Sequence, residues 1–307
     1  MPTQSEPRLP GEWTAQTDTP RRSVFGNYRA AEPPLSGPVG AGNKDPLAGS
    51  GTAAPLRQSI ELALARSFIH RFLAKACEDP TPESWQWLTN PQTASLFRAA
   101  NASMGPSVLA SAEAFINALQ SGRFDSFFNA YLAAVGHAAR GSCPLNEIEY
   151  GDLKADPLFQ PHRLADLAAF YRAFGLEVAD DAGERHDHIC LELEFMCVLA
   201  AKEAYALEHQ LDAGQLAQCR DAQKKFLREH LGRWTPAFTR RFAAATGEPA
   251  LQALAGFTRA FIESECARFG VNPGSDQLAL RSMDETAERM CDSCGIANLP
   301  PGAMAAP

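Results

Sequence analysis

The sequence lacks a long uninterrupted hydrophobic run. Its longest apolar stretch, residues 189–201, contains two glutamates and is shorter than the roughly 20 residues that cross a bilayer. No recognisable signal peptide precedes it. We therefore expect no stable membrane insertion and a cytoplasmic location. The eight cysteines form no disulfide-like framework, so in a reducing compartment they should stay free thiols.

The sequence also lacks an excess of basic residues. Lys and Arg total 28 against 36 Asp and Glu, which gives a net charge of −8. A general nucleic-acid binder needs a basic face, so this class is not expected. An acidic chain instead suits a cationic partner.

Familiar catalytic motifs are missing as well. There is no phosphate-binding glycine loop after a strand, no G-x-S-x-G turn and no H-E-x-x-H helix. No segment shows the alternation of a half-buried strand, and Ala and Leu far outnumber Val and Ile. These patterns predict an all-α protein, with no catalytic residue assigned.

Helical periodicity is dense from residue 56 to about 270. Segments that combine an apolar face with glycine or proline boundaries predict helices. They cover residues 123–136, 161–175, 212–232, 235–247 and 249–270. The 235–247 helix is expected to start with Thr235 as its N-cap. We predict a single domain of about ten helices over 56–270.

The two ends of the chain differ from this domain. Residues 1–55 contain nine of the 22 prolines and seven of the 22 glycines, without apolar periodicity, and are predicted to be a disordered tail. Its Arg21–Arg22 pair is followed by no apolar stretch, so we interpret it as a basic patch rather than an export signal. Residues 271–307 are expected to hold a weaker helix over 275–291 and a tail.

The first candidate site is the start of an oily helix, "RHDHICLELEFM" at residues 185–196. Asp187 is a good N-cap, and His188, Glu192 and Phe195 follow along one helix face. A glutamate in such a helix must be paired or must face water. Glu192 is then either a buried partner of a basic side chain or part of a polar notch in an apolar groove. We favour the groove.

The second candidate is the loop "CPLNEIEYGD", residues 143–152. Glu147, Glu149 and Asp152 cluster there, and Pro144 and Gly151 turn the chain. The loop is either a solvated acidic connection or a functional one, since long loops within helical domains often carry function.

The third candidate is "CDSCG" at residues 291–295, where Cys291 and Cys294 have the spacing of a zinc or redox pair. No second pair or nearby histidine completes a tetrahedral site. We therefore predict no metal site, with these two cysteines as the one weak candidate.

Taken together, the loop P-x-x-E-x-x-Y, the segment "FQPHRLADLAAFYRAFG" and the motif D-H-x-x-x-E-L-E-F-M resemble the TorD/DmsD/NarJ-type chaperones. The resemblance covers roughly residues 58–270, and "KKFLREHLGRWTPAF" fits it too. Leu145 and Asn146 stand where the family's loop has a second proline and an aromatic residue.

The resemblance implies an all-α protein that is not an enzyme. Such a chaperone binds the twin-arginine leader or N-terminal segment of an apo-molybdoenzyme and holds it until the cofactor is inserted. It needs no cofactor of its own and at most contacts the client's molybdopterin transiently. The expected leader-binding residues are Pro144, Glu147, Tyr150, Gly151, Asp187, His188, Glu192 and Phe195.

Three further hypotheses stay open. The chain could be a helical metal-dependent hydrolase that uses His188 and Glu192, or an assembly scaffold without leader specificity. Arg21 and Arg22 could also imitate a leader and occupy the groove when no client is bound.

Overall fold

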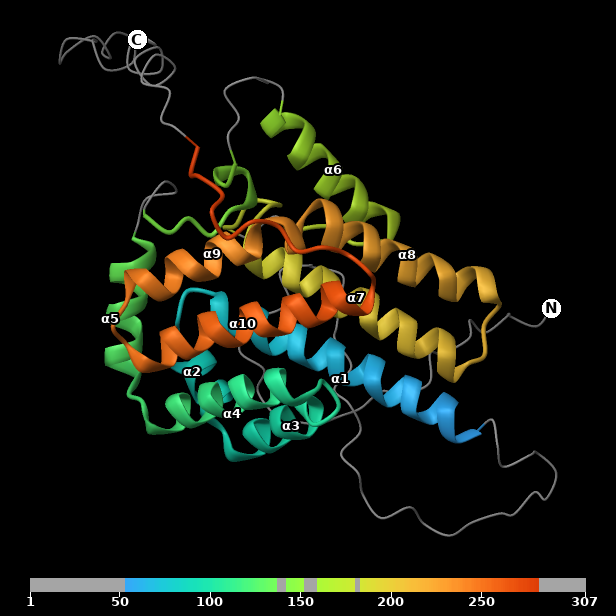
Figure 1. Ribbon diagram of the computed structural model, residues 1–307, viewed down its shortest axis with the longest axis horizontal. Coiled ribbons are helices and arrows are strands. Elements are labelled where there is room, and N and C mark those ends of the chain that lie inside the picture. Colours follow the sequence, from blue (N-terminus) through green and yellow to red (C-terminus); the bar gives the residue numbers. More distant parts are fainter. Residues whose placement is uncertain (1–52, 137–141, 152–158, 180–182, 282–307) are drawn as a thin grey trace, which may run out of the picture.

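The computed structural model describes residues 53–136, 142–151, 159–179 and 183–281 (Figure 1). The predicted tail, apart from its last three residues, lies outside these ranges, as do Arg21, Arg22, Asp152, Cys291 and Cys294. The described part is all-α, as predicted. Its ten α-helices are α1 (Ala53–Cys77), α2 (Pro82–Thr89), α3 (Pro91–Asn101), α4 (Pro106–Ser121), α5 (Phe124–Val135), α6 (Phe159–Ala173), α7 (Ile189–Glu208), α8 (Ala213–Glu229), α9 (Leu231–Ala245) and α10 (Pro249–Arg268). A short 3₁₀ helix, η1, spans Glu147–Glu149.

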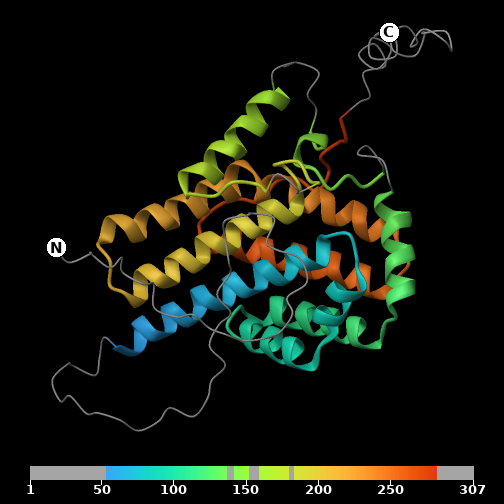
Figure 2. The same ribbon diagram turned by 180° about the vertical axis from the view of Figure 1, so that it is seen from behind.

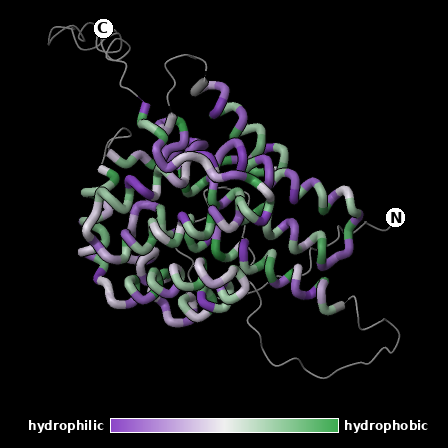
Figure 3. Tube along the Cα trace, viewed as in Figure 1, coloured by the Kyte–Doolittle hydropathy of each residue, from purple (hydrophilic) through white to green (hydrophobic). Residues whose placement is uncertain are grey.

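Helix α7 lies at the centre of the molecule. Residues 189–193 and 195–200 are all buried, which agrees with a helix that is apolar on every side. Helix α1 packs along it, and α8 lies on another side (Figures 1 and 2). The amphipathic helices around it turn their polar residues outward, so hydrophilic and hydrophobic residues alternate along the tube in Figure 3.

Two groups of aromatic rings fill the core. Phe72, Phe97, Phe115 and Phe257 join α1, α3, α4 and α10, with neighbouring ring centroids 4.2–6.2 Å apart. A second group lies under α6, where Phe170 and Tyr171 contact the rings of α7 and α8. Such rings bury large areas, so they fix how the helices cross. These ring contacts attach α6 to α7 and α8.

Helix α9 begins earlier than the sequence predicts. Its first residue is Leu231, so Thr235 is not an N-cap and Pro236 lies inside the helix. Proline cannot donate to the carbonyl four residues before it. Here that carbonyl, of Gly232, instead accepts the N–H of Gly274 at 2.9 Å. A contact from a distant segment therefore satisfies the group that the proline leaves open.

The C-terminal segment also differs from the prediction. Residues 275–281, the described part of the helix expected over 275–291, form a turn and an extended stretch rather than a helix. The segment crosses α9 and ends beside the loop 142–151 (Figure 1). Its extended end forms an isolated antiparallel bridge between Tyr150 and Leu280.

Within the described ranges, no helix has the length and apolarity that a membrane span requires. The six cysteines in these ranges are free thiols and all are buried, which confirms the prediction for them.

Candidate functional site

The site is built on a short antiparallel pairing between the loop 142–151 and the entry into α7. Asn146 and His188 form the bridge. On either side of it, the N–H of Glu147 donates to the Asp187 carbonyl and the N–H of Ile189 donates to the Leu145 carbonyl, both at 2.9 Å. The two candidate segments of the sequence are therefore one structural unit.

Asp187 holds this unit together from inside rather than capping α7. Its buried carboxylate accepts the N–H of Ile148 at 3.1 Å and the amide of Asn146 at 3.2 Å. The guanidinium of Arg185 donates to both of its oxygens, at 2.8 and 3.0 Å. The predicted N-cap role of Asp187 is wrong, because its carboxylate is hydrogen-bonded to the loop instead of to the first turn of α7.

His188 is the N-cap of α7 instead. Its Nδ1 accepts the N–H of Cys190 at 3.3 Å, which requires a neutral ring. Burial lowers the pKa of His188 to about 4, and the charge of Arg185 adds to this against the opposing effect of Asp187. The ring is therefore an uncharged acceptor at neutral pH.

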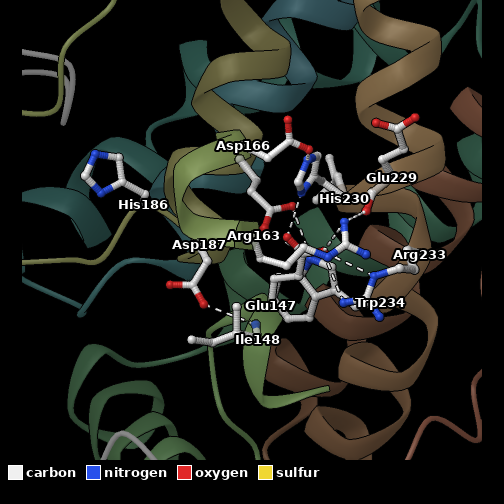
Figure 4. A network of polar contacts seen from close by, with 12 residues as sticks. Glu147, Ile148, Arg163, Asp166, His186, Asp187, Glu229, His230, Arg233 and Trp234 are labelled. Carbon is white, nitrogen blue, oxygen red and sulfur yellow. Dashed lines mark hydrogen bonds and ion pairs between the residues drawn. The ribbon is translucent and has the colours of Figure 1, made fainter. Parts of the chain in front are cut away.

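Glu147 is the hub of a buried polar cluster (Figure 4). Its Oε2 lies 2.8 Å from Nδ1 of His230, and its Oε1 accepts Nη2 and Nε of Arg233 at 3.0 and 3.2 Å. Arg163 of α6 approaches the same oxygen, with Nη1 at 3.6 Å. Three elements, η1, α6 and the start of α9, thus meet on one carboxylate.

Electrostatics explains why this carboxylate stays charged. Burial by itself would raise the pKa of Glu147. The hydrogen bond from His230 and the charges of His230, Arg233 and Arg163 outweigh this effect, and the pKa is lowered. On its other side, Nε2 of His230 lies 3.1 Å from Oδ2 of Asp166.

Asp166 is the accessible member of this cluster. Its side chain is 43% exposed, whereas His230 and Glu147 are completely buried. The backbone carbonyl of Glu229, at the end of α8, accepts a hydrogen bond from Arg163. The cluster therefore opens to solvent at the Asp166 carboxylate of α6, while the buried carboxylate of Glu147 is already paired with Arg163 and Arg233 of the chain itself.

Tyr150, Pro144 and Gly151 shape the loop. The buried hydroxyl of Tyr150 donates to the Pro144 carbonyl at 2.7 Å, and its ring packs 5.0 Å from that of Trp234. Gly151 has φ +129°, a backbone conformation that other residues rarely adopt, so this position favours glycine. Its neighbour's carbonyl, on Tyr150, accepts Nη1 of Arg233 at 3.2 Å.

Glu192 does not face a wet groove. It is fully buried, and both its oxygens accept the indole N–H of Trp234, at 3.2 and 3.1 Å. Burial and the nearby charge of Glu147 raise its pKa well above the ordinary value, and the Trp234 bond only partly offsets them. Its described partner is not a basic side chain either, so both readings of Glu192 from the sequence are wrong.

Of the eight residues expected to bind a leader, all except His188 are buried, and His188 is half-buried. The structure brings Pro144, Glu147, Tyr150, Gly151, Asp187 and His188 together in one unit, while Glu192 and Phe195 lie beneath it in the core. Because seven of these eight side chains are buried, they lie beneath the protein surface and do not line an open groove. The reading of the loop as a solvated acidic connection is also wrong for Glu147 and Glu149, which are buried. Contact of any of the eight with a client stays a prediction.

Sequence reasoning missed the partners of these residues, namely Arg163, Asp166, Arg185, His230, Arg233 and Trp234. The signal available was the unusual order "REHLGRW", which places a histidine, an arginine and a tryptophan around a glycine at a helix boundary. Nothing local indicated that they would meet Glu147, which lies more than 80 residues earlier.

The hydrolase hypothesis gains no support from the geometry. His188 is used as a helix cap and Glu192 as the acceptor of an indole, so the pair is not arranged around a common ion. In the ranges that the structure describes, no three His, Cys, Asp or Glu side chains are grouped as metal ligands would be.

The fold and this site define an all-α protein in which a buried polar cluster holds a loop against the surrounding helices. Comparison with known proteins identifies similar sequences. Residues 97–240 match the family model described as nitrate reductase delta subunit. This range contains the whole cluster around Glu147 and Asp187.

Three relatives match shorter stretches. The chain is 37% identical over 81 residues to the selenate reductase assembly chaperone protein of Thauera selenatis, which is 26% of this chain and 40% of the relative. It is 31% identical over 105 residues to the perchlorate reductase assembly chaperone protein of Dechloromonas aromatica (34% and 46%). It is 32% identical over 93 residues to the chaperone protein TorD of Vibrio cholerae (30% and 40%). The matches span less than half the length of these relatives.

These matches confirm the resemblance predicted from the motifs. Each of the three relatives is named as a chaperone, and none is named for a reaction. Over part of its length the chain is similar to proteins named as assembly chaperones. The finding that these relatives are named as chaperones rather than as catalysts agrees with the prediction that the chain is not an enzyme.

Proposed function

We propose that this protein is a cytoplasmic chaperone for a molybdenum-containing oxidoreductase. It binds the N-terminal leader of the apo-subunit and holds it until the cofactor is inserted. The observation that carries the proposal is the match of residues 97–240 to the nitrate reductase delta subunit family, together with relatives named as assembly chaperones of reductases. The chain itself needs no cofactor for this task.

The arrangement of the carboxylates in the site suggests how a basic leader is bound. Arginine forms its strongest hydrogen bonds with carboxylates. Glu147 and Asp187 are already paired with arginines of this chain, so their role is to fix the loop and the surrounding helices. Asp166 is the member of the cluster that presents a carboxylate to solvent. A client arginine at Asp166 is therefore the contact that we propose.

A peptide titration tests this contact. The probe is a labelled synthetic peptide with an Arg–Arg pair followed by a leucine-rich segment, and the matched peptide carries Gln–Gln instead. We expect the Arg–Arg peptide to bind wild type more tightly, and Asp166→Asn to remove most of that difference. Asp221→Asn, an exposed acid on α8, is the control and should behave as wild type.

Salt gives an independent readout. The screening length falls from about 10 Å at 0.1 M to about 3 Å at 1 M salt, so binding of the Arg–Arg peptide should weaken. The Gln–Gln peptide should respond less, because only its apolar part contributes. Equal affinities of the two peptides at every salt concentration would contradict leader recognition and favour an assembly scaffold without leader specificity.

A further inference from the structure

The C-terminal segment 274–281, here called the strap, lies across α9 and ends on the site. At its start, Gly274 donates its N–H to the carbonyl of Gly232. A Cβ at Gly274 would clash with the backbone oxygen of Arg233, so the strap touches the first turn of α9 backbone to backbone. This contact holds the start of the strap against α9.

The far end of the strap pairs with the loop as a strand would. The N–H of Gly151 donates to the carbonyl of Ala279 at 2.8 Å, and the N–H of Arg281 donates to the carbonyl of Glu149 at 2.9 Å. Both bonds use backbone groups of the strap, so they do not depend on its side chains. Any extended chain could make the same two bonds to residues 149–151.

Few apolar contacts hold the strap in place. Ser275, Gln277 and Ala279 are exposed, and Leu278 and Leu280 are only half-buried. Its carbonyls are otherwise held from outside by Arg240 and Arg241, at 3.2 and 3.3 Å. Segments with little buried apolar surface open at low cost in free energy.

The one charged side chain at the paired end is Arg281. Its Nε lies 3.9 Å from Oε2 of Glu149, a carboxylate that also receives Nη2 of Arg185 at 3.4 Å. Glu149 is buried, so loss of Arg281 from its side would leave a carboxylate facing the opened edge. The chemistry that replaces Arg281 best is another arginine.

We propose that the edge formed by residues 149–151 is a binding site for an extended, arginine-bearing segment of the client, and that the strap occupies this site until the client displaces it. The inference rests on the proposed function and adds a second contact to it. An arginine of the client takes the place of Arg281 at Glu149, and its backbone takes the two bonds of the strap. Arg240 and Arg241 then donate to client carbonyls.

Gly274→Ala tests the strap, because the added methyl group prevents its seating on α9. Hydrogen exchange at the N–H of Gly151 should accelerate, since this group loses its acceptor on Ala279. The Arg–Arg peptide should bind more tightly, by about 5-fold or more, because it no longer competes with the strap. Gly247→Ala, where a Cβ meets nothing within 4 Å, is the matched control and should leave both measurements unchanged.

A synthetic peptide of residues 274–281 makes the test independent of the client. Added to the Gly274→Ala protein, it should slow exchange at Gly151 again and compete with the Arg–Arg peptide. Glu149→Gln should weaken the Arg–Arg peptide while leaving the Gln–Gln peptide unaffected. Should Gly274→Ala fail to fold, Arg281→Glu, which places a like charge beside Glu149, releases the strap by repulsion and takes its place.

The outcomes separate the two proposals. Faster exchange in Gly274→Ala with unchanged peptide affinity overturns the strap as a competitor and leaves the proposed function standing. Exchange that is unaltered in both Gly274→Ala and Arg281→Glu shows that the strap is not displaceable and also overturns the inference. Binding of the strap peptide without binding of the Arg–Arg peptide to any variant keeps the edge site but removes leader recognition.

Discussion

Burial changes the acid–base properties of single residues in this protein. Glu192 is the clearest case, because its carboxyl group lies fully buried in the core and accepts the indole N–H of Trp234. Its pKa is raised well above 4.5 by burial and by the charge of Glu147. The folded protein therefore binds a proton at Glu192 that the unfolded chain releases above about pH 4.5.

We expect Glu192→Gln to become stabilising, relative to wild type, as the pH rises. The pKa of Glu192 is higher in the folded protein than in the unfolded chain. The stability that its bound proton gives the folded protein is therefore fully present below pH 4.5 and is lost as the pH rises to the folded pKa. Glutamine keeps an acceptor for Trp234 without this loss. The stability difference should grow by up to about 1.4 kcal/mol per pH unit. Urea unfolding at pH 5, 6, 7 and 8 measures it, and a difference that is constant with pH contradicts a protonated Glu192.

Asp187 gives a second prediction at this scale. Removal of its carboxylate in Asp187→Ala leaves the N–H of Ile148 buried without its acceptor. We expect a loss of about 2 kcal/mol, because one partner, Arg185, has a side chain that is 40% exposed and can turn into water. Asp221→Ala, on an exposed face, should change stability by less than about 0.5 kcal/mol. Equal unfolding midpoints for the two variants would mean that the loop does not depend on Asp187.

At the scale of elements, the junction between α8 and α9 decides the geometry of the site. The helices are separated by His230 alone, so the histidine of the cluster and Arg233 one turn later keep a constant separation. Gly232 allows this tight junction. A Cβ there would clash with the Leu227 carbonyl and would lie 2.7 Å from Sγ of Cys266.

Two glycine-to-alanine changes should therefore have opposite effects. Gly232→Ala should destabilise the protein by about 1–3 kcal/mol, because neither backbone nor a buried thiol can yield easily. Gly256→Ala, at an exposed position within α10 with nothing within 4 Å of the added carbon, should stabilise it by up to about 1 kcal/mol through helix propensity. Thermal unfolding of both variants checks this, and a neutral Gly232→Ala would show that the junction is looser than described.

At the scale of the molecule, a second buried network ties distant helices together. Arg66 of α1 donates to Glu265 of α10 at 2.6–2.9 Å, to Glu203 of α7 at 2.9 Å and to Gln223 of α8 at 2.6 Å. Burial alone would raise the pKa values of Glu203 and Glu265, but the charge of Arg66 outweighs it and both are lowered. Their contribution to stability is present above about pH 4.5 and is lost as the pH falls through the lowered values.

Arg66→Leu should cost about 3–5 kcal/mol at pH 7, because it removes the buried cation shared by two buried carboxylates and leaves them only the more exposed Arg220 and Arg268. This loss of stability should shrink below pH 4.5. There Glu203 and Glu265 become protonated in the unfolded chain, and in the folded variant they can also become neutral. Arg98→Leu removes a half-exposed arginine that also pairs with a glutamate, Glu113, and should cost less than about 1 kcal/mol. Chemical unfolding at pH 7 and pH 4 compares the two, and similar losses at pH 7 would contradict a stabilising network.

Local sequence determined most of the secondary structure of this protein. Apolar periodicity placed α5, α6 and α10 because those helices bury one face, and Gly136, Gly175 and Gly270 end or follow them with positive φ. The same signal indicated that residues 189–200 form a buried helix. The family resemblance also predicted that the loop around Glu147 and the separate Asp187–His188 motif lie together, and the structure pairs the two segments.

Only the tertiary structure decided where the polar groups point. Pro236 lies within α9 because Gly274, some 40 residues away in sequence, satisfies the carbonyl that it leaves open. Asp187 turns to the loop rather than to its own helix, where Asn146, Ile148 and Arg185 donate hydrogen bonds to its carboxylate. Glu192 is buried against Trp234, and the strap covers the edge at Glu149. Each depends on contacts between segments that are far apart in sequence, and periodicity within one segment carries no information about them.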